Sequence, residues 1–319
     1  MKKYFSVFFA AMMALSCFTA CGSDSAATKE KTNSDSRSLQ IVTTIFPEYD
    51  WVKNILGEES SHADITMLLD NGVDLHSYQP TADDILKVST CDLFLYVGGE
   101  SDAWVEDALK NATNKKMQVI NLMDVMGDAA KEEEEGSEEE PELDEHVWLS
   151  LKNAAVFCDA IANALEKLDP DHAETYHNNA SEYKSELNNL DSGYQSAVEN
   201  AAQKTLLFGD RFPFRYLVDD YGLSYYAAFV GCSAETEASF ETITFLADKV
   251  DALGLKHVMT IEKSDQKIAK TIIENTTEKN QDILTLDSMQ STTSDDVANG
   301  VTYLSIMENN LIVLQKALQ

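Results

Sequence analysis

The sequence predicts an α/β protein of two lobes, each a mainly parallel sheet flanked by helices, joined by one long rigid helix. Short apolar runs alternate with helical patterns in the first part of the chain. One long helical pattern follows at mid-chain, and the alternation then returns. Alternating strands and helices are typical of parallel sheets covered on both faces. We therefore expect an N-terminal lobe at 39–169, a connecting helix at 170–203 and a C-terminal lobe at 204–319.

The expected N-terminal lobe begins with a strand, "LQIVTTIF" (39–46), and a helix, "PEYDWVKNILG" (47–57). Proline is favoured at the first position of a helix and glycine just after its end, so both ends of this helix are marked. Further apolar runs predict strands at 63–69, 91–97 and 117–123, and helical patterns predict helices at 81–88 and 104–112.

The middle of the chain is helical. "HVWLSLKNAAVFCDAIANALEKL" (146–168) reads as an amphipathic helix. Asp169 and Pro170 then supply the cap and the first position of the connecting helix, whose roughly 30 residues would span about 45 Å. A helix of this length between two α/β patterns predicts a strut between the lobes.

The C-terminal lobe repeats the strand and helix alternation. Its expected strands are at 204–210, 224–231, 257–263 and 282–288. Apolar residues at steps of three and four predict one final helix that carries Val297, Val301, Leu304, Met307, Leu311, Leu314 and Leu318.

Charge excludes one class of partner. The formal net charge is −31, from 24 basic and 55 acidic side chains, so the chain repels nucleic-acid phosphates and suits a protein that handles cations. Ten of the fourteen residues at 132–145 are acidic, and we expect a solvated, disordered acidic loop at 131–145. Cys91, Cys158 and Cys232 fit no metal-binding spacing and are expected to be small buried hydrophobic residues.

The N-terminus predicts export. Two lysines precede an apolar run too short to span a membrane, which indicates a signal peptide at 1–20. Cys21 follows small residues in a pattern that resembles a bacterial lipoprotein signal, although Phe18 stands where leucine is usual. We expect lipidation at Cys21, a polar tether at 21–38 and an extracytoplasmic protein anchored to the cell membrane. Cys17 is the weaker candidate for lipidation, and simple secretion is the alternative.

The candidate site lies at strand ends, because open parallel sheets bind ligands beyond the carboxyl ends of their strands. His76, Asp210, Glu262 and Asp287 follow or end predicted strands, and His146 opens the helix after the acidic loop. Two imidazoles and up to three carboxylates are therefore expected on the rims that face the cleft. Each alone is more commonly a turn former or a cap. Five together on one predicted rim raise the expectation of metal binding, but their spacing alone does not establish it. His62, His172 and His177 lie among polar residues and are expected to be exposed, and His257 begins a strand without a neighbouring ligand. The sequence contains neither a P-loop nor a nucleophile elbow.

Several segments resemble the solute-binding lipoproteins of bacterial zinc and manganese ABC importers (cluster A-I type, zinc-binding branch). "GVDLHSYQPTADDILKVSTCDLFLYVGG" resembles their metal-binding segment, with Leu75 in place of the usual proline. "DEHVWLSLKNA" resembles their Asp-Pro-His-x-Trp segment and "TYLSIMENNLIVLQKAL" their C-terminal helix. The resemblance covers 39–319, and it implies two lobes around one metal ion and a partnership with an ABC permease and its ATPase subunit.

The resemblance implies His76, His146 and Asp287 as metal ligands. The family's third ligand is a histidine or glutamate, and "FGDRFPFRYLVDDYGL" has neither at that place. Asp210 is the nearest carboxylate and Glu262 the reserve. Arg211 is expected to be a charge partner for one of these carboxylates.

Zinc is the expected metal, with manganese as the alternative. Imidazoles suit zinc, carboxylates favour harder ions such as manganese, and zinc binds a given site more tightly. Binding should weaken as pH falls through the histidine range, because the imidazoles must be neutral. A secreted metal-dependent hydrolase with Glu262 as base is the other class of function, but no feature requires a base near the metal. The resemblance thus implies a monomeric receptor and not an enzyme.

Overall fold

The computed structural model describes residues 37–131, 143–229, 231 and 237–319, which all belong to one compact unit, Arg37–Gln319. The expected signal peptide, Cys21 and most of the tether lie outside the described residues. So do most of the expected acidic loop and Cys232. The described residues hold no helix that is both long and apolar enough to cross a membrane.

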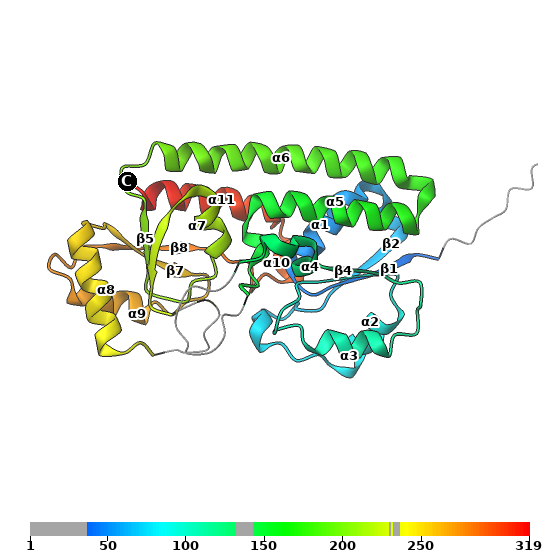
Figure 1. Ribbon diagram of the computed structural model, residues 1–319, viewed down its shortest axis with the longest axis horizontal. Helices are drawn as coiled ribbons and strands as arrows, with labels where there is room; N and C mark the ends of the chain where they lie inside the picture. The colour runs from blue at the N-terminus through cyan, green and yellow to red at the C-terminus, as the bar shows by residue number, and fades with distance from the viewer. Residues whose placement is uncertain (1–36, 132–142, 230, 232–236) are drawn as a thin grey trace, which may run out of the picture. The chain divides into compact units, whose positions relative to one another are not determined.

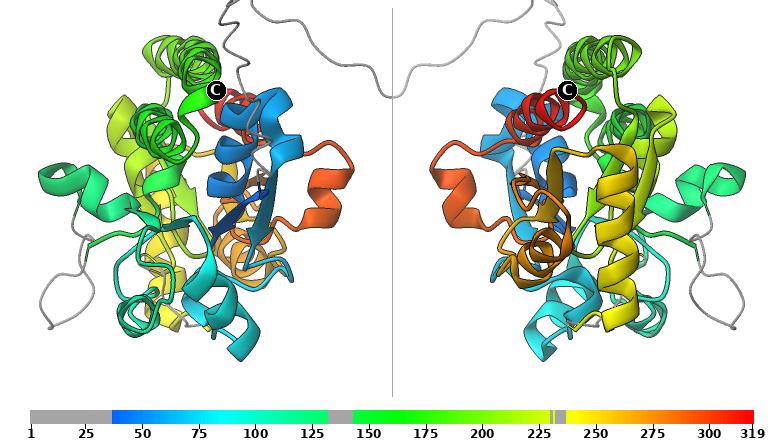
Figure 2. Two further views of the ribbon diagram at one scale, coloured as in Figure 1. Left: turned by 90° about the vertical axis from the view of Figure 1, so that its right-hand side faces the viewer. Right: turned by 90° about the vertical axis from the view of Figure 1, so that its left-hand side faces the viewer.

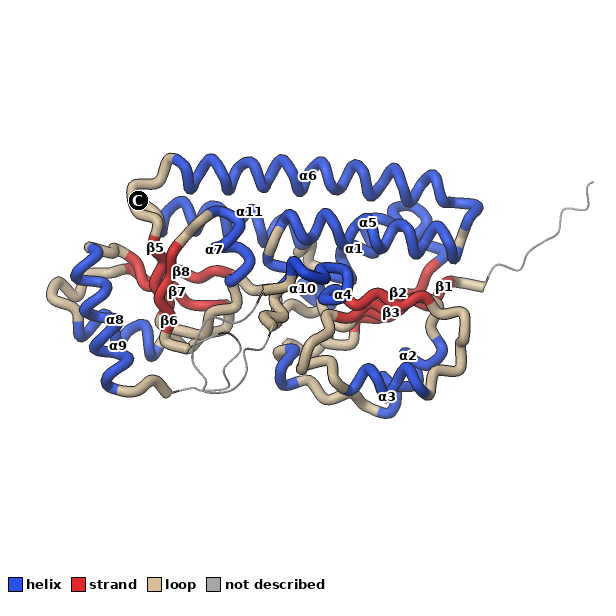
Figure 3. The backbone as a smooth tube through the Cα atoms, viewed as in Figure 1, coloured by secondary structure: helices blue, strands red, loops and turns tan. Residues whose placement is uncertain are grey.

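Four parallel strands form the N-terminal sheet, in the order β2-β1-β3-β4 (Figures 1 and 3). They are β1 (Leu39–Thr43), β2 (Ala63–Met67), β3 (Leu93–Tyr96) and β4 (Gln118–Asn121). The apolar run predicted to be a strand at 39–46 therefore ends earlier, because Phe46 already belongs to the following helix. β1 and β3 are central, and side chains of both are largely buried.

The C-terminal sheet repeats this arrangement in the order β6-β5-β7-β8, again with every pairing parallel. Its strands are β5 (Thr205–Phe208), β6 (Ser224–Ala227), β7 (His257–Ile261) and β8 (Asp282–Leu286). In each sheet the first strand of the lobe pairs with the second and the third. The predicted fold class, two lobes with mainly parallel sheets flanked by helices, is confirmed.

The helices cover both sheets. They are α1 (Phe46–Leu56), α2 (Ala82–Thr90), α3 (Trp104–Lys110), α4 (Leu122–Met126), α5 (Leu151–Leu168), α6 (Ala173–Glu199), α7 (Arg215–Tyr221), α8 (Phe240–Leu253), α9 (Lys267–Asn275), α10 (Ser294–Ala298) and α11 (Tyr303–Ala317). Short 3-10 turns lie between them: η1 (Gly57–His62), η2 (Leu75–Ser77), η3 (Gly127–Ala129), η4 (Val147–Leu149) and η5 (Pro170–His172).

The long helix α6 has 27 residues and follows directly on η5. It contacts α1 and α5 of the N-terminal part as well as α7 and α11 of the C-terminal part. In end-on views α6 lies beside these helices, on the side away from α2 and α3 (Figure 2). Tyr183, Leu187 and Tyr194 of α6 are buried in one apolar core that includes strands of both sheets. This shared core makes α6 a rigid connection.

One predicted element was wrong. The apolar pattern from Val297 to Leu318 is two helices, α10 and α11, and not one. Gly300 lies between them with φ of +94°, a conformation that favours glycine and ends a helix. Thr302 caps the new helix through the Ser305 amide. Val297 and Val301 still pack on the core, which explains why the apolar spacing ran through the break.

Two of the three cysteines expected to be buried lie in the described residues. Cys91 and Cys158 are both free and buried, as predicted. Burial raises the pKa of the Cys91 thiol to about 12. Neither side chain therefore presents a thiolate, which is the form that binds metals.

Candidate metal site

His76 lies in the loop that follows β2, within the 3-10 turn η2. Asp74 caps this turn, because its Oδ1 accepts a hydrogen bond from the His76 amide at 3.0 Å. The imidazole is held through Nδ1, which lies 2.6 Å from Ser101 Oγ and 3.5 Å from Glu145 Oε2. The other ring nitrogen, Nε2, is therefore the atom that can bind a metal.

His146 is held in the same way but more deeply. It precedes η4, and α5 begins only at Leu151, so it does not open the long helix directly as expected. Asp144 Oδ1 accepts from the His146 amide at 2.8 Å and lies 3.0 Å from its Nδ1. The side chain is fully buried. A carboxylate on Nδ1 sets the tautomer in which Nε2 carries a lone pair.

The two imidazoles meet through these Nε2 atoms, which lie 3.4 Å apart. Ligand atoms at the usual zinc distances of 2.0–2.1 Å lie about 3.4 Å apart in a tetrahedron. The spacing therefore suits two ligands on one metal ion. Without a metal the same distance fits an N–H to N hydrogen bond, in which Ser101 donates to His76 Nδ1 and His76 Nε2 donates to His146 Nε2.

Burial and the neighbouring charges shift the pKa values of the two imidazoles in opposite directions. Burial and the nearby His146 lower the pKa of His76 to about 4, so this ring is neutral at neutral pH. Burial also acts to lower the pKa of His146, but the charge and hydrogen bond of Asp144 outweigh it, and the pKa is raised. A proton on His146 is thus the main competitor of a metal ion at this pair.

Asp287 follows β8 in the second lobe. Its Oδ1 accepts from the Met289 amide at 2.7 Å, and its backbone amide and carbonyl both bond the buried side chain of Asn310 on α11. Burial and the charge of Glu262 raise the pKa of Asp287 to about 6. A buried carboxylate next to another carboxylate gains from a bound cation, which suits a metal ligand.

Asp210 and Glu262 use their oxygens to hold neighbouring loops. Asp210 Oδ2 accepts from Ser264 Oγ and, at 3.4 Å, from the Ile261 amide, which ties the loop after β5 to the end of β7. Glu262 accepts from the Ser288 amide at 2.7 Å and from the Gln290 amide at 3.2 Å. Glu262 therefore shapes the loop that carries Asp287.

The structure pairs the two imidazoles but does not gather the three carboxylates around them. Within the described ranges, the group of three or more His, Cys, Asp or Glu whose ligand atoms all lie within 4.8 Å of one another is Glu59, His62 and His172, away from these loops. The strand-end residues therefore stand as an imidazole pair on one lobe and carboxylates on the other.

Arg211 corrects an expectation. Its guanidinium pairs with Asp74 at 3.0 Å, and not with a candidate ligand carboxylate as predicted. The Gln290 amide, turned so that both of its ends have partners, also donates to Asp74. Asp74 thus joins the turn that carries His76 to two loops of the other lobe. Sequence reasoning missed this role because the partners lie far apart along the chain.

The aspartates that orient the two imidazoles were missed, although the sequence repeats their spacing. "DLH" (74–76) and "DEH" (144–146) both place an aspartate two residues before the histidine. In each case the aspartate accepts a hydrogen bond from the histidine amide. Short side chains with an oxygen commonly bond the backbone two residues on. The shared Asp-x-His spacing is the signal that could have identified these residues.

Gly99 makes room for the group beside His76. Its φ is +75°, and a Cβ at this position would overlap the carboxylate of Glu145. Glu145 in turn accepts from the Ser101 amide at 2.9 Å, and Ser101 contacts His76. The two glycines of "YVGGES" were predicted to turn the chain tightly, and both have positive φ. Gly99 also lets Glu145 approach the loop, whereas Gly98 lies against Asn121.

Solved structures with this fold include metal-bound proteins. The chain is 30% identical to the Zn(II)-bound ZnuA-like domain of Streptococcus pneumoniae AdcA, with a TM-score of 0.71 over 88% of this chain and 99% of that domain. It is 25% identical to a mutant of the laminin-binding adhesin Lmb from Streptococcus agalactiae, with a TM-score of 0.75 over 88% of this chain and all of that chain. These likenesses match the two-lobe fold described above.

Proteins that are similar in sequence have names that refer to zinc binding or zinc uptake. The high-affinity zinc uptake system protein ZnuA of Bacillus subtilis is 29% identical, with 99% of this chain and 98% of the relative covered. The zinc-binding protein AdcA of Streptococcus pyogenes serotype M6 is also 29% identical over 87% of this chain, but this chain spans only 55% of that protein's length. The model of one family, zinc-uptake complex component A periplasmic, matches residues 41–317, and the chain therefore belongs to that family.

Proposed function

We propose that this chain is an extracytoplasmic receptor that captures a zinc ion between its lobes and delivers it to an ABC transporter. The observation that carries the proposal is the pair of Nε2 atoms 3.4 Å apart, each on a ring held through Nδ1. Two imidazoles oriented in this way, at the spacing of two ligands of one zinc ion, support a metal site.

The proposed ligands are His76, His146, Asp210 and Asp287. Asp287 is supported by its raised pKa and by its two backbone hydrogen bonds with the Asn310 side chain, one donated by the Asp287 amide and one accepted by its carbonyl. Asp210 would have to share its oxygens with Ser264 and Ile261, so its place in the set depends on a small rearrangement of the loop. Glu262 is the reserve.

Zinc is favoured over manganese by the two imidazoles. Manganese prefers more oxygen ligands, and zinc is the tighter binder at a given mixed site. The printed names of the relatives, zinc-binding protein AdcA and zinc uptake protein ZnuA, point the same way. Proton competition at His146 should weaken binding as pH falls, as expected from the sequence.

The remaining parts of the proposal concern where the protein acts. Cys21 is the proposed lipidation site and 21–38 the tether, which would hold a monomeric receptor at the outer surface of the membrane. The lipoprotein name of the AdcA relative from Streptococcus pneumoniae supports an anchor. The proposed partners are a permease and its ATPase subunit. A hydrolase is disfavoured because Glu262, its expected base, already binds Ser288 and Gln290.

Two measurements test the function. Calorimetric titration of the chain with zinc and with manganese should give tight binding of zinc and weaker binding of manganese. Zinc uptake by cells that lack the chain should fall at low external zinc and recover when the wild-type chain is restored. Tighter binding of manganese would contradict the metal assignment, and unchanged zinc uptake would contradict the transport role.

A further inference from the structure

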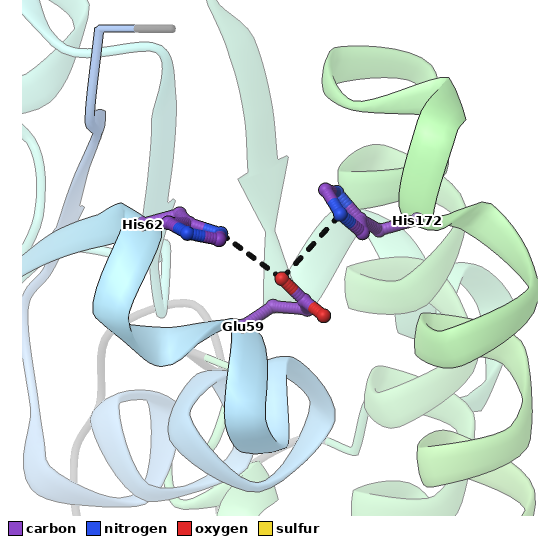
Figure 4. Close-up of side chains that lie close together, drawn as sticks. All are labelled: Glu59, His62 and His172. Carbon is purple, nitrogen blue, oxygen red and sulfur yellow. Dashed lines mark hydrogen bonds and ion pairs between the residues drawn. The ribbon is translucent and has the colours of Figure 1, made fainter.

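A second group of metal-binding side chains lies away from the strand-end loops. Glu59 and His62 come from η1, which connects α1 to β2, and His172 comes from η5 at the start of α6. Figure 4 shows both imidazoles pointing at the carboxylate of Glu59. Of the three residues, His62 and His172 were expected from the sequence to be simply exposed histidines. The fold instead brings them together from distant parts of the chain.

The distances suit a metal ion. Glu59 Oε2 lies 3.0 Å from His62 Nδ1 and 3.5 Å from His172 Nε2. One ligand atom from each residue lies within 4.8 Å of the others. Tetrahedral zinc with ligands at 2.0–2.2 Å needs donor atoms about 3.3–3.6 Å apart. Only a small adjustment of the exposed His62 ring would close three donors around one ion.

The His172 ring is already oriented through its other nitrogen, Nδ1. Its Nδ1 lies 2.6 Å from Asp169 Oδ2, and the same oxygen accepts a hydrogen bond from Tyr176 at 2.7 Å. This places a carboxylate behind the imidazole and leaves Nε2 facing Glu59. Carboxylate, histidine and metal in this order are the usual arrangement around zinc, since the outer carboxylate fixes the ring and raises its basicity.

We propose that Glu59, His62 and His172 bind a second divalent transition-metal ion, with zinc as the best match, and water in the fourth position. The side chains of His62 and His172 are 60% and 36% exposed and that of Glu59 is 20% exposed, so a hydrated ion can reach the group directly. The bound ion ties η1 to the start of α6. This site is independent of the proposed binding between the lobes.

The competing explanation is that the two imidazoles share the Glu59 carboxylate in ordinary polar contacts that need no metal. The pKa of His172 is raised by its hydrogen bond to Asp169, which favours a proton in the absence of metal. Under this explanation zinc would not bind. The two explanations therefore predict opposite results when zinc is added near neutral pH.

The test uses the chain with His76→Ala and His146→Ala, so that the site between the lobes is disabled. A short glycine linker replaces 132–142, so that weak association of zinc with the glutamates there does not enter the stoichiometry. Calorimetric titration should give one equivalent of bound zinc. Adding His62→Ala or His172→Ala should weaken this binding at least tenfold. His177→Ala is the matched control, because His177 is also an exposed histidine, on α6, and it should have no effect.

A second measurement guards against misfolding of the combined variants. In the chain that lacks only 132–142 and keeps both interlobe histidines, His62→Ala should lower the zinc stoichiometry from two equivalents to one and leave the tighter one intact. Zinc should also raise the melting temperature of the variant that lacks the interlobe histidines. When His172→Ala is added to that variant, zinc should no longer raise its melting temperature. A single equivalent in the chain that lacks only 132–142, or a second equivalent there that survives His62→Ala and His172→Ala, would overturn the proposal.

Discussion

At the scale of single residues, the imidazole pair is fixed by what each ring does with Nδ1. Ser101 and Glu145 surround this atom of His76, and Asp144 accepts from it in His146. The rings are therefore oriented before a metal arrives, and little conformational entropy is lost on binding. Such a pair binds an ion more tightly than two mobile surface histidines would.

We predict that His76→Ala and His146→Ala each lower the zinc affinity at the interlobe site by more than 100-fold. This exceeds the 10- to 100-fold typical of residues behind the ligands, because each change removes a donor atom. Calorimetry measures the affinity, and circular dichroism checks that the fold survives. His257→Ala, at the start of β7, is the control and should bind zinc normally. Unchanged affinity in either variant would remove that histidine from the ligand set.

The third ligand is decided by comparing Asp210→Asn with Glu262→Gln. Both changes keep the shape of the side chain and an acceptor oxygen for the loop hydrogen bonds, but both remove the charge that binds a cation. If Asp210 is the ligand, Asp210→Asn should weaken zinc binding by more than 100-fold and Glu262→Gln by less. Calorimetry of the two variants gives the answer. A larger loss in Glu262→Gln would exchange their roles.

At the scale of elements, the first turn of α1 contains a buried carboxyl group, that of Glu48. Glu48 accepts from the Thr44 amide at 2.8 Å and the Ile45 amide at 3.3 Å, and its side chain is fully buried. Burial and then the charge of Asp102 raise the pKa of Glu48 to about 8 from its ordinary 4.5. The folded chain therefore retains a proton that the unfolded chain loses well below neutral pH.

This retained proton predicts how stability depends on pH. Between about 4.5 and 8 the folded state binds more protons than the unfolded state, so the free energy of unfolding should fall as pH rises. Glu48→Gln cannot ionise and should be more stable than the wild type at pH 8, on the order of 2–4 kcal/mol, with little difference at pH 4. Urea unfolding at both values measures this. The exposed Glu58→Gln is the control, and an equal pH slope in Glu48→Gln and wild type would contradict the pKa of Glu48.

At the scale of the whole molecule, the fold was largely predictable because its signals are local. Strand and helix periodicities, Pro47 at the start of α1 and Pro170 before α6 all act within a few residues. The split between α10 and α11 was missed because core contacts kept the apolar spacing across Gly300.

The candidate site was less predictable than the fold. The resemblance to a known family pointed to His76 and His146. The Asp-x-His spacing, which marks the two aspartates that orient them, was also in the sequence but was not used. The pairing of Arg211 with Asp74, and of His62 and His172 with Glu59, depends on loops that only the folded chain brings together. Periodicity and spacing carry no information about such contacts.

The acidic segment 132–142 tests whether the whole charge of the chain contributes to metal capture. It holds eight of the 55 acidic residues, and its removal changes the net charge from −31 to −23. The residues on either side of it, Lys131 and Asp144, are held by hydrogen bonds. The Lys131 carbonyl accepts from the Asp144 amide at 2.8 Å, and Lys131 Nζ donates to Asp219 at 2.6 Å. Lys131 should therefore be kept, and a short glycine linker can replace the segment.

We predict that this deletion leaves tight zinc binding at the interlobe site within about threefold of the wild type. The imidazole pair is oriented by residues outside the segment, and a dense run of negative charge raises the local concentration of cations without forming a ligand shell. The association rate at low ionic strength should fall severalfold, and this difference should vanish at high salt, where the field is screened. Stopped-flow binding with a competing zinc indicator measures the rate and calorimetry the affinity. Loss of tight binding in the deletion would mean that a ligand lies between 132 and 142.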